Sequence, residues 1–291
     1  MNGIILVNKH KSCTSRDVVN DLCKIFNTKK IGHTGTLDPN ATGLLVLGIN
    51  EGTKIIDLIN KSDKEYVAQV ILGIQTDTYD ITGKVLYTSD VSNISDKQIL
   101  EVLKKYKGII NQKVPKYSAV KVNGKRLYEY ARENLDVEIP SKDVNIYTLD
   151  LISEIKREDN KIYFTIKTKV SSGTYIRSLI YDIGKDLKVS SCMGDLNRTS
   201  HGNFSLDNAY TVEEIRQNNF NMLNFDDSLK HLKRYEISLR FYKKIMNGII
   251  IDNEYEEDKI LFVYKNKVIA IYQVYDKDNT KMKPYRIFNK R

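Results

Sequence analysis

Apolar positions recur along the chain in two rhythms, one typical of strands and the other typical of helices. Residues 3–7 and 43–49 form apolar runs, which predict buried strands. Residues 64–74 alternate between apolar and polar positions, which predicts a strand with one buried face. Helices are predicted where apolar residues recur every three or four positions or where a capping pattern begins: 14–26, 52–60, from 95 onward, 174–187, from 211 onward and 239–246.

The pattern changes beyond about residue 228, where short strands and turns replace the longer elements. Further strands are predicted at 84–88, which would pair back onto the preceding strand, at 143–156 and 161–170 around a charged turn at 157–160, and at 248–251, 259–264 and 267–274. The basic tail 281–291 is expected to be loosely ordered. We therefore expect an α+β fold: a mixed, mainly antiparallel sheet with flanking helices in residues 1–228, and a small β-rich domain in residues 229–291.

Composition and charge narrow the classes of function. The 291 residues are 41% hydrophobic and 29% charged, as in ordinary globular proteins, and no run of 18 apolar residues predicts a membrane helix. The first apolar run is too short for a secretion signal, and the three cysteines have no metal-ligand spacing, so we expect a cytoplasmic protein with reduced thiols. The net charge of +9 favours a polyanionic partner such as nucleic acid over a membrane surface, since the chain shows no basic amphipathic helix or lipidation motif.

A polar loop at Gly32–Gly43, with the sequence GHTGTLDPNATG, is the strongest candidate for chemistry. It places the carboxylate of Asp38 and the imidazole of His33 among glycines and a proline, just before a buried strand. Ordinary turns also collect such residues, because Asp and Thr side chains bond to their own backbone. The string nevertheless resembles the signature of bacterial tRNA pseudouridine synthases of the TruB family. In that family the aspartate of the motif is catalytic, and it corresponds to Asp38.

Further motifs of that family follow in order along residues 1 to about 210. Tyr66, at the head of a predicted strand, resembles the tyrosine that stacks on the target uracil. Tyr175 and Arg177, in the string SSGTYIRSL, resemble the active-site tyrosine and arginine, and Leu196 matches the apolar residue beneath the uracil. Asp80, in TDTYD, is expected to contact a nearby arginine without touching the substrate.

His33 and a basic segment are expected to handle the RNA. The resemblance places His33 where it could insert into the space left by the flipped base, although a general-base role stays open. Residues 113–140 resemble the insertion that clamps RNA in the family, with Val114 where a proline is usual. Its phosphate-binding candidates are Lys116, Lys121, Lys125, Arg126 and Arg132. Residues 244–251 weakly resemble a PUA RNA-binding domain, which would make the small domain PUA-like.

The resemblance implies a complete reaction. A uridine in the T loop of tRNA, at position 55, would be flipped out, cleaved at its N1–C1′ bond, rotated and rejoined through C5 to give pseudouridine. Because nothing is oxidised or hydrolysed overall, no cofactor or metal is expected. Asp38 could act as a nucleophile or as a base toward the sugar. We expect tRNA as the partner, no obligatory protein partner, no membrane association and a monomer.

Other classes of protein stay open from the residues alone. An RNA-binding module without catalysis would need the basic residues but not Asp38. A metal-dependent nuclease could use the carboxylates of Asp38, Asp77 and Asp80.

Overall fold

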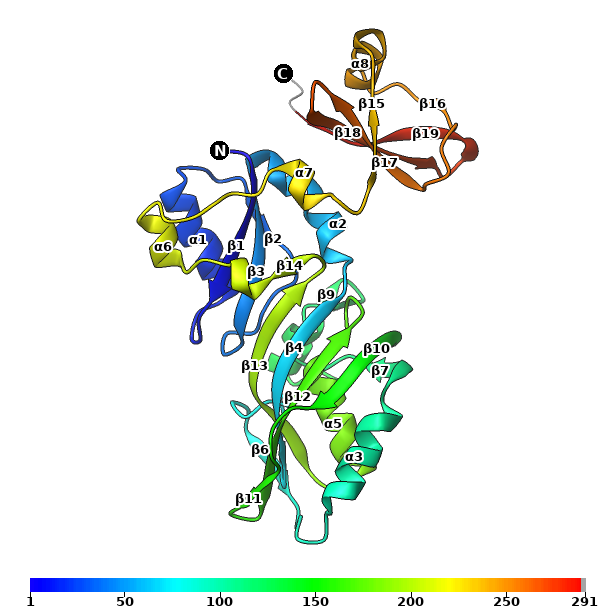
Figure 1. Ribbon diagram of the computed structural model, residues 1–291. Coiled ribbons are helices and arrows are strands. Elements are labelled where there is room, and N and C mark those ends of the chain that lie inside the picture. The colour runs from blue at the N-terminus through cyan, green and yellow to red at the C-terminus, as the bar shows by residue number, and fades with distance from the viewer. Residues whose placement is uncertain (289–291) are drawn as a thin grey trace.

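The strands assemble into two separate sheets in the computed structural model, which describes residues 1–288 (Figure 1). The larger sheet has ten strands and runs in the order β1-β3-β13-β4-β12-β10-β7, with β2, β11 and β14 paired at its margins. Its strands are β1 (Gly3–Lys9), β2 (Ile31–His33), β3 (Thr42–Ile49), β4 (Lys64–Leu72), β7 (Gly108–Lys113), β10 (Ser141–Leu151), β11 (Lys156–Glu158), β12 (Lys161–Val170), β13 (Ser191–His201) and β14 (Phe204–Ser205).

Strand pairing in this sheet is antiparallel except between β3 and β13. These two strands meet in parallel where Asn197 pairs with Thr42 and Arg198 with Gly43. The parallel contact brings the loop before β3 next to the central strand β13. The mixed, mainly antiparallel sheet that the sequence predicts is thereby confirmed.

Helices cover the larger sheet on its apolar faces, except α4, which lies beside residues 125–126. They are α1 (Ser15–Ile25), α2 (Ile56–Asn60), α3 (Asp96–Lys105), α4 (Leu127–Arg132), α5 (Ile176–Asp186), α6 (Val212–Arg216) and α7 (Phe225–Ser228), with 3₁₀ turns η1 (Asn50–Ile55) and η2 (Leu206–Asn208). Capping boxes at Thr14, Ser95 and Thr211 begin α1, α3 and α6, because each side chain accepts the N3 amide that the helix leaves unpaired.

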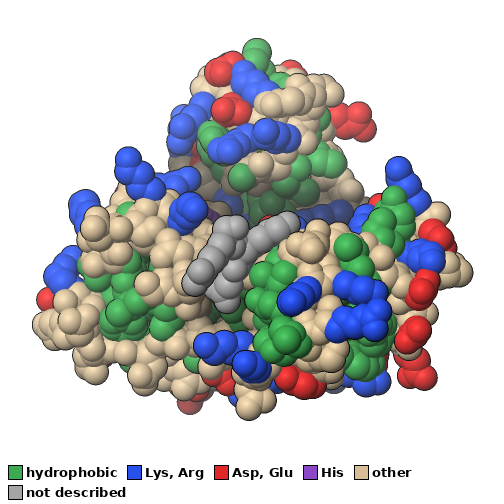
Figure 2. Space-filling view, turned by 90° about the horizontal axis from the view of Figure 1, so that it is seen from above, with side chains coloured by type: hydrophobic (Ala, Val, Ile, Leu, Met, Phe, Trp, Pro, Cys, Tyr) green, Lys and Arg blue, Asp and Glu red, His purple; other side chains and the backbone are tan. Residues whose placement is uncertain are grey.

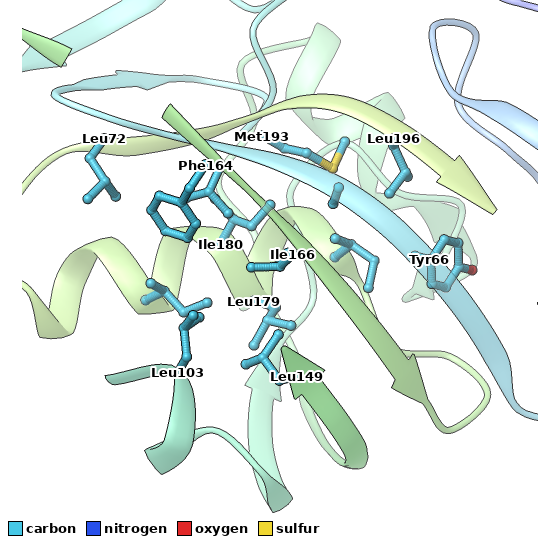
Figure 3. Packing of buried hydrophobic residues seen from close by; sticks show 14 of the residues in the cluster. Tyr66, Leu72, Leu103, Leu149, Phe164, Ile166, Leu179, Ile180, Met193 and Leu196 are labelled. Carbon is cyan, nitrogen blue, oxygen red and sulfur yellow. The ribbon is translucent and has the colours of Figure 1, made fainter. Parts of the chain in front are cut away.

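The main core lies between the sheet and the pair α3 and α5. Alternate residues of β4, among them Ala68, Val70 and Leu72, pack there against apolar side chains of β10, β12 and α5. Figure 3 shows this cluster as a row that runs from Leu72 and Leu103 to Tyr66 and Leu196. The row ends at Tyr66 because the face of β4 that is apolar in its middle becomes polar at its first residue, Lys64.

The smaller sheet has five strands and stands apart from the ribbon of the larger one in Figure 1. It contains β15 (Lys233–Glu236), β16 (Ile251–Asp252), β17 (Lys259–Tyr264), β18 (Lys267–Tyr275) and β19 (Asp278–Ile287), and α8 (Leu239–Met246) packs on it. Leu261, Val263 and Ile271 share an apolar cluster with Ile4 and Leu44 of the larger sheet. An ion pair of 3.0 Å between Arg286 and Asp57 lies at the same junction.

Two small hairpins complete the fold. β5 (Ile74–Thr76) pairs with β6 (Val85–Thr88), and β8 (Lys121–Val122) pairs with β9 (Lys125–Arg126). The predicted strand 64–74 is therefore interrupted at Gly73, whose φ of +101° breaks the extended backbone. The strand at 84–88 does pair back, but onto β5 and not onto β4.

Two further expectations are wrong. Part of the charged turn predicted at 157–160 is strand β11, and the turn itself is Asp159–Asn160, both with positive φ. The tail expected to be loose forms β19 as far as Ile287, because its backbone continues the pairing with β18; residues 289–291 of that tail lie outside the described residues. Among the described helices, none has the length and apolar character that a bilayer crossing would need.

Candidate active site

The loop between β2 and β3 carries Asp38 in a tight, glycine-dependent path. Gly35 and Gly43 have φ of +55° and +100°, in the region that favours glycine. A side chain at Gly43 would lie 2.2 Å from Oδ1 of Asn197 and 2.4 Å from the carbonyl oxygen of Arg198. Glycine at this position is therefore what allows β3 to approach β13 closely enough for the parallel contact.

Buried polar groups from three different elements hold this loop. Nζ of Lys9, at the end of β1, donates to the carbonyl of Pro39 at 3.0 Å. Oγ of Ser15, in α1, accepts the amide of Leu37 at 3.0 Å. Both terminal nitrogens of Arg198, in β13, donate to the carbonyl of Gly35 at 3.0 Å. The backbone on both sides of Asp38 is thus fixed, while the Asp38 side chain keeps 41% of its surface exposed.

The exposed carboxylate of Asp38 is paired with a buried guanidinium. Nε of Arg177, in the first turn of α5, lies 3.0 Å from Oδ2 of Asp38. The same guanidinium lies 3.9 Å from a carboxylate oxygen of Asp80, and it donates to the carbonyls of Tyr117 at 3.0 Å and Thr78 at 3.1 Å. The two contacts predicted from the sequence, of Arg177 with Asp38 and of Asp80 with an arginine, are both present in this arrangement.

Two cavities share Asp38 in their walls. One, of about 550 Å³, is lined by Tyr66, Tyr175 and Lys64, and the other, of about 380 Å³, by Asp80, Ile81 and Met193. The residues common to both are Asp38, Tyr117, Arg177 and Leu196. At the junction of two cavities, the Asp38 carboxylate can contact a ligand bound in one cavity. The second cavity then leaves room for a part of that ligand to move.

The larger cavity offers flat and apolar surfaces beside the carboxylate. Tyr66 and Leu196 close the end of the core row in Figure 3. Tyr175 is half-buried, and burial raises the pKa of its phenol, so the hydroxyl is neutral at physiological pH. Its backbone is held at both polar atoms by Gln112 of β7, which donates to the carbonyl at 3.1 Å and accepts the amide at 2.8 Å. Lys142 lies over the Tyr175 ring at 4.9 Å.

His33 stands at the end of β2 and does not line either cavity. Its ring is half-buried, and its Nδ1 has no hydrogen-bond partner among the described residues. Burial, with a smaller effect of the Arg16 charge, lowers the pKa of this imidazole. The ring is therefore neutral at physiological pH, which suits contact with an uncharged base.

The basic insertion reaches the cavity through one of its predicted residues. Arg126 lines the larger cavity together with Tyr117 and Tyr128. Lys116, Lys121 and Arg132 are exposed outside it, while Lys125 is paired with Glu133. The guanidinium of Arg132 lies 5.3 Å from the centre of the Tyr128 ring. Figure 2 shows many Lys and Arg side chains across the face seen from above, in keeping with the net charge of +9.

Three residues of the site escaped sequence reasoning as functional groups. Tyr117 supplies the carbonyl that Arg177 binds, and its hydroxyl lies 3.3 Å from Asp77. Lys64 and Gln112 reach the site from β4 and β7. For Lys64 and Gln112 the available signal was polarity at inward-facing strand positions, where an apolar residue is expected.

The carboxylates that a nuclease would need do not converge. Asp77 is turned to the amide of Lys84, at 2.8 Å, and to Tyr117, whereas Asp38 and Asp80 share the guanidinium of Arg177. Within residues 1–288, no group of three or more His, Cys, Asp or Glu side chains could hold a metal ion.

Comparison with solved structures assigns the fold. The chain matches a protein in the structure of an H/ACA ribonucleoprotein bound to a substrate RNA containing 2′-deoxyuridine, with a TM-score of 0.69 and 21% identity over 98% of this chain and 84% of that one. A Cbf5–Nop10–Gar1 complex gives the same TM-score, with 23% identity over 94% and 78% of the two chains.

Comparison of sequences assigns the class and then the family. Residues 23–176 match the model of a family of pseudouridylate synthases, so the chain is an enzyme of the class that isomerises uridine to pseudouridine. The family is described as TruB family pseudouridylate synthase, N-terminal domain, and the chain belongs to it.

Curated relatives support the same assignment over nearly the whole chain. A protein of Clostridium tetani is 40% identical, over 94% of this chain and 92% of its own length. One of Staphylococcus aureus (strain MRSA252) is 41% identical, over 99% of each chain. Both are named tRNA pseudouridine synthase B.

Proposed function

We propose that this enzyme converts the uridine at position 55, in the T loop of tRNA, to pseudouridine, with Asp38 as the catalytic residue. The observation that carries the proposal is the pairing of Asp38 with buried Arg177 at the junction of two cavities. The choice of tRNA is supported by the names of relatives that are 36–41% identical over 94–99% of the chain. The net charge of +9 suits a polyanionic substrate.

The reaction needs an ionised carboxylate beside the ribose. Arg177 stabilises that ionised form, because a cation within about 4–6 Å favours the charged state of an acid. Asp38 then acts either as a nucleophile at C1′ or as a base that removes a proton from the sugar. In both routes the N1–C1′ bond breaks and its electron pair leaves with the uracil, whose negative charge the Arg177 guanidinium offsets.

The detached uracil must turn before C5 bonds to C1′, which displaces the Asp38 carboxylate in the first route and accompanies return of the proton to the sugar in the second. C5 then loses its proton and N1 gains one, so the product is an isomer of the substrate. Tyr66, Tyr175 and Leu196 give it flat or apolar surfaces on which rotation breaks few hydrogen bonds. The target base has to leave its loop first, at a cost of a few kcal/mol. His33, neutral and close to the Asp38 loop in sequence, would stack in the space that the base leaves.

Other basic residues would hold the RNA around this site. Arg126 faces the cavity, and Lys116, Lys121, Lys125 and Arg132 lie on the same insertion, where they could meet phosphates. Residues 229–291, with the five-stranded sheet, would serve as a PUA-like RNA-binding domain. The enzyme would act in the cytoplasm as a monomer, without a metal, cofactor or protein partner.

The test incubates the wild-type protein and Asp38→Asn with an unmodified T-arm hairpin RNA in EDTA, followed by nucleoside analysis. We expect pseudouridine from the wild type and none from the variant, with the affinity for the hairpin unchanged within about threefold, since one exposed carboxylate is neutralised. Asp150→Asn, which neutralises an exposed carboxylate paired with Lys107, is the matched control and should keep full activity.

Three results would overturn the proposal. Strand scission restored by a divalent cation would indicate a nuclease. Tight binding without pseudouridine would indicate a binding module. Full activity of Asp38→Asn would remove Asp38 from the chemistry.

A further inference from the structure

Two buried cations in the wall of the larger cavity have no carboxylate partner among residues 1–288. Lys64 is 6% exposed and Arg198 is 1% exposed, and their hydrogen bonds all go to backbone carbonyls. Arg177 in the same cavity differs, because it is paired with Asp38. Burying an unpaired charge costs several kcal/mol, so an anion that enters the cavity would recover part of this cost.

Lys64 is the member of the pair that can reach a ligand. Its Nζ donates to the carbonyls of Asn60 and Ser62, each at 2.9 Å, and an ammonium has three donors. The third N–H has no hydrogen-bond partner among residues 1–288, and Lys64 lines the cavity together with Gly35 and Ser172. All three guanidinium nitrogens of Arg198 donate to the carbonyls of Leu44 and Gly35, so this side chain holds the Asp38 loop.

The electrostatic setting of Lys64 fits a site that is completed by an anion. Desolvation, with a smaller contribution from the charge of Arg198, lowers the pKa of its ammonium to about 8, and Asp63 opposes this weakly. A phosphate beside Nζ would reverse the effect and keep the lysine charged.

The position of Lys64 along β4 indicates which anion. Lys64 and Tyr66 lie two residues apart on the same face, roughly 7 Å along the strand. A nucleotide with its base against Tyr66 and its ribose at Asp38 carries its negative charge on the phosphates that flank the ribose. The spacing from Tyr66 to Lys64 is comparable with the span of one nucleotide.

We propose that Lys64 binds one of the two phosphodiesters that flank the nucleotide isomerised at Asp38. This inference rests on the proposed function and adds a residue from outside the basic insertion to the RNA contacts. The site would recognise the backbone of the flipped nucleotide and so hold its C1′ at Asp38. Because a phosphodiester is present whatever the base, the contact would position the substrate without selecting its sequence.

The experiment tests whether Lys64 and a single phosphate of the RNA interact, by removing the charge of each in turn. A set of T-arm hairpins, each with one neutral methylphosphonate linkage in the T loop, is bound to the wild type, to Lys64→Met and to Lys104→Met. Lys104 is exposed on α3 and provides the matched loss of one charge. We expect one flanking linkage whose neutralisation weakens wild-type and Lys104→Met binding roughly ten- to hundredfold, as for a hydrogen bond to a charged group. Lys64→Met should be insensitive to that linkage and show a salt slope smaller by about one.

A wild-type protein equally tolerant of every flanking methylphosphonate would overturn the inference, and that measurement needs no variant to fold. Equal sensitivity of Lys64→Met and the wild type would overturn it as well. Lys64→Arg, which keeps the charge, should keep the sensitivity. Pseudouridine formation by the wild type on the unsubstituted hairpin is measured in parallel, so its absence would refute the proposed function separately.

Discussion

Gln112 offers the sharpest test of how the active site is positioned. Its side-chain amide is fully buried and holds both backbone polar atoms of Tyr175, the N-cap residue of α5, two positions before Arg177. The side chain of Tyr175 makes no capping hydrogen bond to the helix. The Gln112 side chain, on β7, instead accepts the Tyr175 amide, which the helix itself leaves unpaired. Gln112→Met keeps a side chain of similar length and removes both hydrogen bonds.

The size of the effect follows mainly from the Tyr175 amide, which is left unpaired, since the Tyr175 carbonyl still accepts the amide of Leu179 at 3.0 Å. At roughly 1–3 kcal/mol for a buried amide without a partner, the variant should lose about 1–3 kcal/mol of unfolding free energy. Release of the first turn of α5 would also shift the Arg177 guanidinium from its position 3.0 Å from Asp38. A displacement of about 1 Å in a catalytic group typically costs on the order of a hundredfold in rate.

The assay compares unfolding with single-turnover pseudouridine formation at a temperature where every variant is folded. We expect kcat to fall about a hundredfold in Gln112→Met while KM changes less than about threefold, because the proposed phosphate contacts of the RNA lie elsewhere. Gln112→Glu keeps the acceptor for the Tyr175 amide and loses the donor to the Tyr175 carbonyl. Its kcat should therefore lie between those of the wild type and Gln112→Met. Ser95→Ala, which removes the cap of α3 far from the site, should cost about 1 kcal/mol of stability and leave kcat unchanged.

The reasoning would be refuted by a Gln112→Met protein that is destabilised but turns over at the wild-type rate. Gln112 would then be a structural residue alone. A proportional loss of kcat in Ser95→Ala would refute it too, since any weakened helix would then suffice.

Two other changes test the contacts of the Arg177 guanidinium and the burial of His201. Arg177→Lys should lower kcat at least about a hundredfold with KM nearly unchanged, because a single ammonium cannot contact Asp38, Asp80 and two carbonyls at once; a wild-type rate in rapid-quench measurements would contradict this. Burial lowers the pKa of His201 to about 2, so below about pH 6.5 the unfolded chain binds a proton that the native protein does not. Relative to His201→Gln, the wild type should lose about 1.4 kcal/mol of stability between about pH 7.5 and about pH 5.5 in denaturant titrations, and parallel pH profiles would contradict this origin.

The elements that could be predicted from the sequence are those whose apolar residues follow one regular spacing. β1, β3, β4 and α1 are apolar at regular spacing, and all four form where the pattern indicates. β13 has no such rhythm, although it joins β3 to β4. Its register shifts between Met193 and Leu196 and again after Arg198, so its inward residues do not alternate, and only the completed sheet identifies it as a strand.

The same distinction applies to the site. Asp38 and Arg177 stand in continuous motifs, so their pairing could be expected from the sequence alone. Gln112 acts on a backbone 63 residues away, and nothing near it in the sequence marks that contact. Lys64 is notable only because it is buried without a carboxylate, a property that belongs to the folded chain.

The anchoring of the Asp38 loop also determines how the enzyme loses activity on heating. Its ties run to Lys9 in β1, Ser15 in α1 and Arg198 in β13, so the loop cannot open while those elements stay in place. Most functional loops belong to the least stable part of their protein and exchange their amide hydrogens first. Here the amide of Leu37 should exchange only with global unfolding, which makes the Asp38 loop part of the same cooperative unit as the sheet.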